Sequence, residues 1–304
     1  MKLIDNVKKI PHVIWFQYWK NLEKLSKYIN PYWNDAARYY RITGKKMSWR
    51  HPQDMSQKLL WLNRYWQPQL KADCADKYRM KEYVKSCGLD EINVPLIGVW
   101  NSPDDIDWSR LPNQFVIKTN HGCGTNIICK DKSKLDVEGA KVKLKHWLTI
   151  DFGKLYNEVH YSNIKPCIFA EEYLPTMSLY QTDYKFQCIN GEPYCILICA
   201  DRGADGEAQL FSYNLKWERV PLLNGEEHTM SREFQKPLQF NKMIEYARIL
   251  ARPFPYVRVD FYEVDGKLYI GELTFTPYGN IMTYYKNSIL EDMGNKLVLP
   301  PKMV

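Results

Sequence analysis

Residues 114–130, QFVIKTNHGCGTNIICK, combine two residue types that can handle phosphate groups. Gly122 and Gly124 stand two positions apart, and Lys118 ends the apolar run before them. Glycines let backbone N–H groups approach a ligand closely, and such a concave array of donors suits phosphate oxygens, to which a lysine adds a point charge. The spacing is not that of the Walker loop, and the strand-like residues after Gly124 do not fit a dinucleotide-binding turn. A strand, a phosphate-binding loop and a returning strand are predicted, with an ordinary glycine hairpin as the alternative.

Acidic side chains form a second candidate group, in a predicted hairpin around Asp265-Gly266. Apolar residues alternate there with Arg258 and Asp260, so both should point to one face, and Glu272 lies in the partner strand. Two neighbouring carboxylates lower the stability of a folded protein unless a cation lies between them. A hard divalent cation prefers such oxygen ligands. A two-residue turn would pair Asp260 with Gly271 and turn Glu272 to the opposite face, whereas a three-residue loop would set the acids opposite each other. A metal site therefore requires the longer loop, and a charged, exposed strand pair is the alternative.

The composition is that of an ordinary globular protein of 304 residues, long enough for one large domain or two to three smaller ones. The net charge of +7 fits a small anionic substrate or an anionic membrane surface, and it is too diffuse to predict nucleic-acid binding. The 8 cysteines include no C-x-x-C pair, which favours reduced thiols in a cytosolic protein over disulfides or zinc. Without a membrane-spanning run or a signal-peptide pattern, a cytoplasmic location is expected.

The N-terminal region, residues 1–75, is aromatic and favours helices. Residues 10–19, IPHVIWFQYW, are flanked by lysines. Such a segment either lies on a membrane surface or packs its aromatic side chains on the main domain. Pro11 interrupts any amphipathic helix there, which favours packing.

Local patterns place further charged residues on predicted elements. Asp76 can cap a helix that carries Lys77 in its first turn. Residues 167–174 predict a strand that ends in Glu171 and Glu172, either a binding edge or a charged exit from the sheet.

The C-terminal half reads as strands around one helix. Asn190-Gly191 is a hairpin signal that joins strands predicted over residues 183–190 and 192–200, and Lys185 lies in the first of them. A helix is predicted over residues 241–251, before the acidic hairpin.

These pieces together resemble the ATP-grasp superfamily, and more closely its TupA-like branch, which is linked to teichuronopeptide and other cell-surface polysaccharide synthesis. The resemblance covers roughly residues 55–280 and rests on five stretches in the family order: DKYRMKEYV (76–84), FVIKTNHGCGTNIICKDKSKLD (115–136), EEYL (171–174), DYKFQCINGEP (183–193) and VRVDFYEVDGKLYIGELTFTP (257–277).

The resemblance implies an α+β fold in which two α+β subdomains hold ATP between antiparallel sheets, preceded by a helical, aromatic-rich N-terminal region. The expected division is an N-terminal helical region (1–75), a linking helix and strand (76–112), a small subdomain with the glycine-rich lid (113–175) and a C-terminal subdomain with the metal site (176–304).

The resemblance also implies roles for single residues. Lys77 and Lys118 match the two nucleotide-binding lysines. The lid over the phosphates corresponds to His121, Gly122, Cys123, Gly124, Thr125 and Asn126. The hinge that meets adenine and ribose corresponds to Glu171, Glu172, Tyr173 and Leu174.

Four residues of the last two stretches carry the implied chemistry. Asp260 and Glu272 look like Mg²⁺ ligands, Arg258 resembles the residue that steadies the transferring phosphate, and Lys185 is similar to a basic residue facing substrate or phosphate. Thr274 stands where many relatives have Asn. After Pro277 the chain reads YGN, where relatives often have a glycine/serine-rich turn.

The function that follows is an ATP- and Mg²⁺-dependent, ADP-forming ligase that joins a carboxylate to an amine through an acylphosphate. We expect an amide on a uronic or amino-acid carboxylate in capsule or teichuronopeptide-like synthesis, with contact to the inner face of the membrane as a further option. One rival is a glycosyltransferase, which would use an acid pair such as the D-x-D within residues 104–107, DDID. The other is a nucleotide-binding regulatory protein without turnover.

Overall fold

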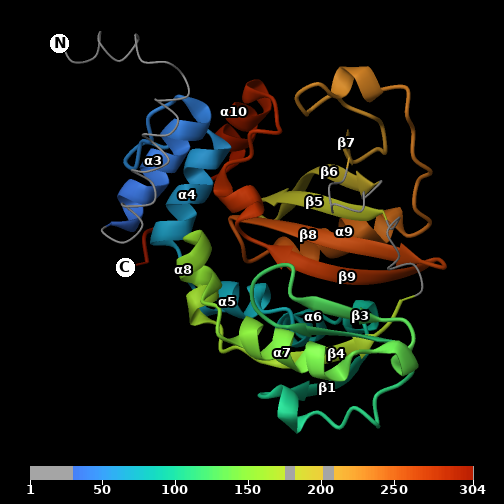
Figure 1. Cartoon of the computed structure of the whole chain (residues 1–304). Helices are drawn as coiled ribbons and strands as arrows, with labels where there is room; N and C mark the ends of the chain where they lie inside the picture. Colours follow the sequence, from blue (N-terminus) through green and yellow to red (C-terminus); the bar gives the residue numbers. More distant parts are fainter. Residues whose placement is uncertain (1–29, 175–181, 201–208, 304) are drawn as a thin grey trace.

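The described part of the protein is built around two antiparallel sheets. The computed structural model describes residues 30–174, 182–200 and 209–303. The smaller sheet has the strand order β1-β4-β2-β3, and the larger has the order β7-β6-β5-β8-β9. In Figure 1 the smaller sheet lies below the larger one, and helices from both ends of the chain pack beside them on the left. The α+β architecture with two antiparallel sheets confirms the expected fold class.

The smaller sheet carries the glycine loop. Its strands are β1 (Leu96–Trp100), β2 (Phe115–Thr119), β3 (Asn126–Cys129) and β4 (Ile168–Glu172). Helix α7 (Val137–Leu148) covers one face, where Leu144 packs among Phe115, Ile117 and Ile168. Asp136 caps α7, since its Oδ1 accepts from the N–H of Gly139 at 2.9 Å.

The larger sheet carries the acidic hairpin. Its strands are β5 (Asp183–Ile189), β6 (Glu192–Ala200), β7 (Gln209–Tyr213), β8 (Tyr256–Val264) and β9 (Lys267–Thr274). Helix α9 (Phe240–Ala251) packs on one face, and the apolar residues Val257, Val259 and Phe261 are fully buried in the core that it joins. The period of two along β8 therefore turns Arg258 and Asp260 to the opposite face.

The register of the β8–β9 hairpin differs from both predicted alternatives. Its turn holds two residues, Asp265-Gly266, both with positive φ, yet Asp260 pairs with Glu272. A β-bulge at Gly271 supplies the extra residue, so the prediction that this pairing requires a longer loop is wrong. A side chain at the bulge would require Tyr262 to move, because a Cβ on Gly271 would lie 2.6 Å from its ring.

Helices near both chain ends pack beside the sheets (Figure 1). They are α3 (Pro31–Thr43), α4 (Met55–Tyr65), α5 (Gln69–Ala75), α6 (Met80–Ser86) and α10 (Asn287–Lys296). Helix α6 begins later than expected, and the turn before it is held by Asp76, whose Oδ1 accepts from the N–H groups of Tyr78 and Arg79. Within the described ranges no helix is both long and apolar enough to cross a membrane. The aromatic segment at residues 10–19 lies outside the described residues.

Candidate active site

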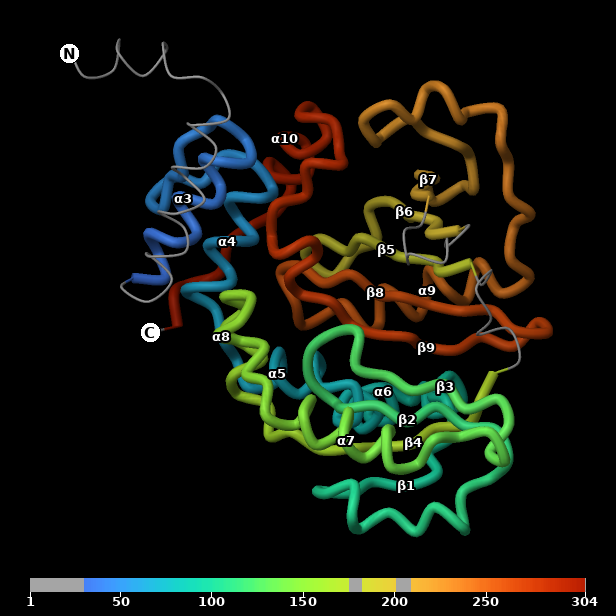
Figure 2. The backbone as a smooth tube through the Cα atoms, viewed as in Figure 1, coloured from blue at the N-terminus to red at the C-terminus, as the bar shows by residue number. Residues whose placement is uncertain are grey.

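The loop between β2 and β3 depends on Gly122. Its φ is +73°, and a Cβ there would lie 2.4 Å from the ring of Phe152 in helix α8 (Phe152–Tyr156). Its carbonyl oxygen accepts a hydrogen bond from Nζ of Lys77. Figure 2 shows this loop rising from the smaller sheet toward β9. The chain thus brings a lysine and the glycine loop together, as the sequence predicts.

His121 anchors the loop to the segment before helix α8. The side chain is buried, its Nε2 donates to the carbonyl oxygen of Ile150 at 3.0 Å, and its ring meets Phe152 edge-on. Burial lowers the pKa of His121, so the imidazole is neutral at physiological pH. Thr125 is also buried and its hydroxyl accepts from that of Thr119, whereas Cys123, Gly124 and Asn126 are exposed.

Asn120 is an anchor that the sequence analysis missed. Its Nδ2 donates to Oδ2 of Asp76 at 2.7 Å, and its Oδ1 accepts from the N–H of Cys167 at 2.8 Å. The carbonyl oxygen of Asn120 accepts from the N–H of Lys77 at 2.9 Å. This one side chain therefore joins the glycine loop, the turn that carries Lys77 and the start of β4.

Glu171 gathers two lysines on the smaller sheet. Both Lys81 and Lys118 form ion pairs with its carboxylate, whose side chain is 5% exposed. Burial raises the pKa of Glu171, but the two lysines outweigh it and leave the pKa lowered. Lys81 was not predicted as a site residue, although it stands four residues after Lys77 in the stretch DKYRMKEYV, a spacing that often brings side chains together.

The rest of the predicted hinge divides between surface and core. Glu172 is exposed, and Tyr173 is partly buried. Leu174 packs with Val94 and with Val264 and Tyr269 of the acidic hairpin. The end of β4 is therefore tied to the larger sheet.

Arg258 holds the acidic face of the larger sheet together. Its Nε and Nη2 donate to the two oxygens of Asp260, each at 2.7 Å, and Nη2 also donates to Oε1 of Glu272 at 2.7 Å. The hydroxyl of Thr274 donates to the same Oε1 at 2.9 Å. Lys185 of β5 pairs with Asp260 at 2.6 Å and with Asp183 at 3.3 Å. All five predicted or noted side chains of this group thus meet on one face.

The two acids differ in exposure and ionisation. The side chain of Asp260 is 1% exposed and that of Glu272 is 38% exposed. Burial raises the pKa of Asp260 although Arg258 and Lys185 oppose the shift. Burial also acts on Glu272, but Arg258, Lys77 and Lys185 outweigh it and lower its pKa to about 2. Glu272 therefore remains a carboxylate across the physiological range.

These residues fit a magnesium ion. Asp260 and Glu272 both accept from Nη2 of Arg258 at 2.7 Å, so the two carboxylates lie close together on one face. Among the described residues, no group of three or more His, Cys, Asp or Glu side chains could hold a metal. Mg²⁺ commonly takes only one or two carboxylates and completes its shell with substrate phosphates and water. The oxygen donors present match that pattern, with Glu272 as the more accessible one.

A pocket of about 440 Å³ lies where residues of the two sheets meet. Gly122 and Cys123 line it from the loop, and Arg258, Glu272 and Thr274 line it from the larger sheet. The positive charge of Lys77 lowers the pKa of Glu272. Burial lowers the pKa of Lys77, and the negative charge of Glu272 opposes that shift. The two groups therefore interact across the site.

The sequence analysis missed three further residues of the pocket wall. Arg38 comes from α3, and Glu158 and Tyr161 lie in or next to the short helix η4 (Val159–Asn163). No motif connects segments so distant in the sequence, so only the fold could identify them.

A pocket between two antiparallel sheets, with a lysine-anchored glycine loop on one side and Glu272 beside Arg258 on the other, is the arrangement of an ATP-grasp protein. The TupA-like ATP-grasp family matches residues 57–298, and the chain belongs to this family. No curated protein is significantly similar to it.

Several solved structures resemble the fold at low identity. The L-amino acid ligase from Bacillus licheniformis is 14% identical over 74% of this chain and 50% of its own, with a TM-score of 0.47. The D-alanine–D-alanine ligase from Bacillus anthracis is 14% identical over 74% of this chain and 67% of its own, with a TM-score of 0.43. The N5-carboxyaminoimidazole ribonucleotide synthetase from Thermus thermophilus is 15% identical over 74% of this chain and 49% of its own, with a TM-score of 0.39. The chain thus spans half the length of the first of these ligases.

Proposed function

We propose that this protein is an ATP- and Mg²⁺-dependent ligase that joins a carboxylate to an amine through an acylphosphate. Membership of the ATP-grasp family supports the use of ATP. The observation that carries the proposal is the meeting of two unlike groups at one pocket: the glycine loop, which Lys77 holds through the carbonyl oxygen of Gly122, on one side, and Glu272 with Arg258 on the other. A triphosphate bound by the first group would present its terminal phosphate to the second.

On the smaller sheet, the proposal assigns the phosphates to Lys77, Lys118 and the backbone N–H groups of residues 122–126. Since Glu171 is buried against its lysines, its carboxylate orients Lys118. Exposed Glu172 and partly buried Tyr173 are left to meet ribose and adenine, while Leu174, which packs in the core, fixes the end of this strand. Closure of the loop would exclude water, which otherwise hydrolyses an acylphosphate.

On the larger sheet, Arg258 and Lys185 would stabilise the charge on the transferring phosphoryl group. Both are held in place by Asp260, which fixes the direction of their donors. Asp260 and Glu272 would hold Mg²⁺, which supplies charge neutralisation at the phosphates when it is bound. The hydroxyl of Thr274 offers a further oxygen beside Glu272 in place of the asparagine of many relatives.

The substrate acid is proposed to be a uronic or amino-acid carboxylate of a cell-surface polysaccharide, made available at the inner face of the membrane. This part rests on membership of the TupA-like family alone. The alternative function, a glycosyltransferase, gains no support, because acids of residues 104–107 already bind other groups of the protein. Asp104 pairs with Lys145 at 2.8 Å, and Oδ2 of Asp105 accepts from the N–H of Ser102.

The test is ADP release from ATP and Mg²⁺ in the presence of a panel of uronic acids, amino acids and amines. A ligase releases ADP only with an acid and an amine together. Lys118→Ala should lower that rate by about 100-fold or more, while Lys130→Ala, an exposed lysine of the same hairpin, should not. ATP binding without ADP release under every pair would support the regulatory protein, and consumption of a sugar nucleotide instead would support the glycosyltransferase.

A further inference from the structure

One wall of the pocket comes from outside the family match. Helix α3 precedes residue 57, where that match begins, yet its Arg38 lines the pocket together with Glu158, Tyr161 and Glu272. The N-terminal part of the chain therefore shapes a cavity that reaches the proposed reaction centre.

Arg38 brings a cation with unused donors to this wall. Its Nη2 donates to the carbonyl oxygen of Gly279, another pocket residue. Its Nε is buried and has no hydrogen-bond partner in the described part of the chain, where Arg38 also forms no ion pair. A guanidinium at a pocket wall suits a carboxylate, to which it can donate hydrogen bonds.

Glu158 brings an acid to the same pocket. Burial raises the pKa of Glu158 to about 7, against the opposing effects of a hydrogen bond from Thr276 and the charges of Arg38 and Lys71. The charged and titratable groups that surround Glu158 come from several elements: Arg38 of α3, Lys71 of α5, Tyr161 of η4, Cys123 of the loop and, in the same pocket, Glu272 of β9. His160, which is neutral, lies near Lys71. A carboxyl group in this range can accept a proton and release it again near neutral pH.

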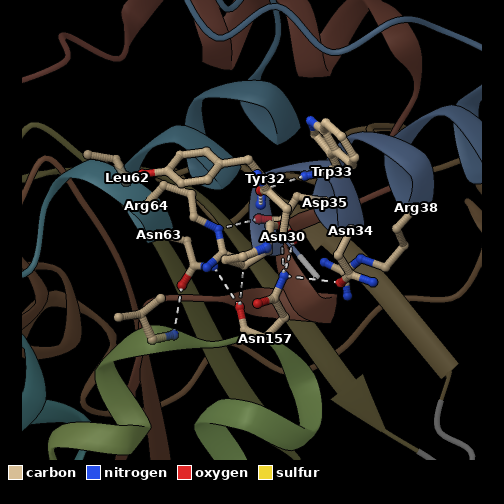
Figure 3. Close-up of polar contacts among 12 residues, drawn as sticks. Asn30, Tyr32, Trp33, Asn34, Asp35, Arg38, Leu62, Asn63, Arg64 and Asn157 are labelled. Atoms are coloured by element: carbon tan, nitrogen blue, oxygen red, sulfur yellow. Dashed lines mark hydrogen bonds and ion pairs between the residues drawn. The ribbon is translucent and has the colours of Figure 1, made fainter. Parts of the chain in front are cut away.

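A buried polar network fixes Glu158 from both sides (Figure 3). The carbonyl oxygen of Asn157 accepts from Nδ2 of Asn63 at 2.8 Å, and Oδ1 of Asn63 accepts from the N–H of Val159 at 3.2 Å. Nδ2 of Asn157 donates to Oδ1 of Asp35 at 2.7 Å, and Asp35 pairs with Arg64 at 2.7 Å. Helices α3 and α4 therefore hold the backbone on which Glu158 stands.

We infer that this pocket binds the amine substrate, and that this substrate is an amino acid or a similar zwitterion. This inference rests on the proposed ligase function. Its carboxylate meets Arg38 and its ammonium group meets Glu158. The rings of Phe152, Tyr156, Tyr161 and Tyr278 enclose its side chain. A cation and an anion in one pocket select a molecule that carries both opposite charges.

Glu158 then acts in the second half-reaction. Its carboxylate takes one proton from the ammonium group, and the freed lone pair forms the C–N bond to the acyl carbon. The bond between that carbon and the phosphate oxygen breaks, and the second proton of the amine leaves with phosphate. Glu158 returns its own proton to solvent after each turnover.

Hydroxylamine separates this step from the first one. It is largely uncharged at neutral pH, so it traps an acylphosphate as a hydroxamate without needing a base. Glu158→Gln should lower the rate of amide formation with amino acids by about 100-fold or more, while hydroxamate formation stays within about twofold of the wild type. Equal losses in both assays, or no loss in either, would overturn the role of Glu158. In the wild type, the rate with amino acids should fall more steeply than the hydroxamate rate as the pH drops below about 7.

Matched amines test Arg38. Each L-amino acid is compared with the amine left when its carboxylate is removed, such as L-alanine with ethylamine. In the wild type kcat/KM should favour the amino acid, and Arg38→Ala should reduce that preference by about tenfold or more, mainly through KM. Arg38→Lys should restore part of it, and Arg41→Ala, on the same helix but not in the pocket, should leave it unchanged. An equal preference in wild type and Arg38→Ala would contradict the assignment.

The two proposals fail in different ways. If the wild type forms neither ADP nor hydroxamate with any acid of the panel, the ligase function is wrong. If it forms both, and the Glu158 and Arg38 variants treat amino acids as the wild type does, only the pocket assignment is wrong.

Discussion

The two sheets bring opposite balances of charge to the candidate site. On the smaller side cations are in the majority, with Lys81 and Lys118 around Glu171 and Lys77 beside Asp76. On the larger side the acids are in the majority, with Asp183, Asp260 and Glu272 around Arg258 and Lys185. Surplus positive charge suits a triphosphate, and surplus negative charge suits a divalent cation that bridges its oxygens. Under the proposed function, each sheet is thus suited to one part of the Mg²⁺–ATP complex.

The sheets also differ in how they present their groups. The smaller sheet offers a loop whose backbone donors and carbonyl oxygens are exposed by glycine, and Lys77 holds it through the carbonyl oxygen of Gly122. The larger sheet offers side chains that bind one another, centred on Asp260. Substitutions should therefore affect the fold on the larger sheet more than on the loop.

Asp260→Asn should have the largest effect on stability. It removes a buried carboxylate that accepts from both Arg258 and Lys185, and it leaves two cations without their main partner. Breaking a buried pair in this way costs about 3–5 kcal/mol of unfolding free energy, measured by urea denaturation without metal. Asp265→Asn, exposed in the turn of the same hairpin, should cost about 0.5 kcal/mol or less. Equal midpoints for the two variants would refute the view that Asp260 organises this face.

Glu171→Gln should have the next largest effect, and it should depend on pH. Loss of its charged hydrogen bonds should cost about 1.5–3 kcal/mol at neutral pH. Since Lys118 and Lys81 lower the pKa of Glu171 from 4.5, its pairing stabilises the fold fully above that value and ceases to do so as the pH falls through the lower folded-state pKa.

Unfolding free energies of wild type and Glu171→Gln, measured from neutral to strongly acidic pH, should therefore converge at the acidic end. The exposed neighbour provides the control, because Glu172→Gln should run parallel to the wild type. A constant gap for Glu171→Gln would show that its ionisation does not stabilise the smaller sheet.

Glu272→Gln should separate metal binding from stability. Its partly exposed pair with Arg258 should contribute about 1 kcal/mol or less to the unfolding free energy. The Mg²⁺ concentration that gives half the maximal ADP-forming rate should rise by about 10- to 100-fold. Titration of the rate with Mg²⁺ measures this shift, and an unchanged requirement would move the metal away from Glu272.

Local patterns predicted the elements because each depends on neighbours in the chain. Alternation along β8 turned Arg258 and Asp260 to one face, and Asn190-Gly191 joined β5 to β6 as expected. The register of the last hairpin could not be predicted, because the bulge at Gly271 reflects a close approach of Tyr262 that turn chemistry does not encode.

The wall of the pocket that contains Glu158 could not be predicted for a related reason. Glu158 follows Asn157, whose left-handed conformation ends α8, and its neighbours are held by α3 and α4 across more than 90 positions of sequence. Asn63 and Asp35 look like ordinary polar helix residues in isolation. Their role arises only when the helices pack.

Cys123→Ser should have the smallest effect, and it tests whether the loop works through its backbone. The residue is exposed between Gly122 and Gly124, and its side chain lines the pocket. Partial burial of the thiol raises the pKa of Cys123 although Lys77 opposes the shift, so little thiolate is present at neutral pH. Serine keeps the size of the side chain and leaves the backbone donors in place, so the ADP-forming rate should stay within about twofold. Alkylation by iodoacetamide should likewise be slow at neutral pH and accelerate as the pH rises. If activity disappears while ATP binding persists, the sulfur takes part in covalent chemistry, and the contrast between a loop of backbone groups and a sheet of side chains no longer holds.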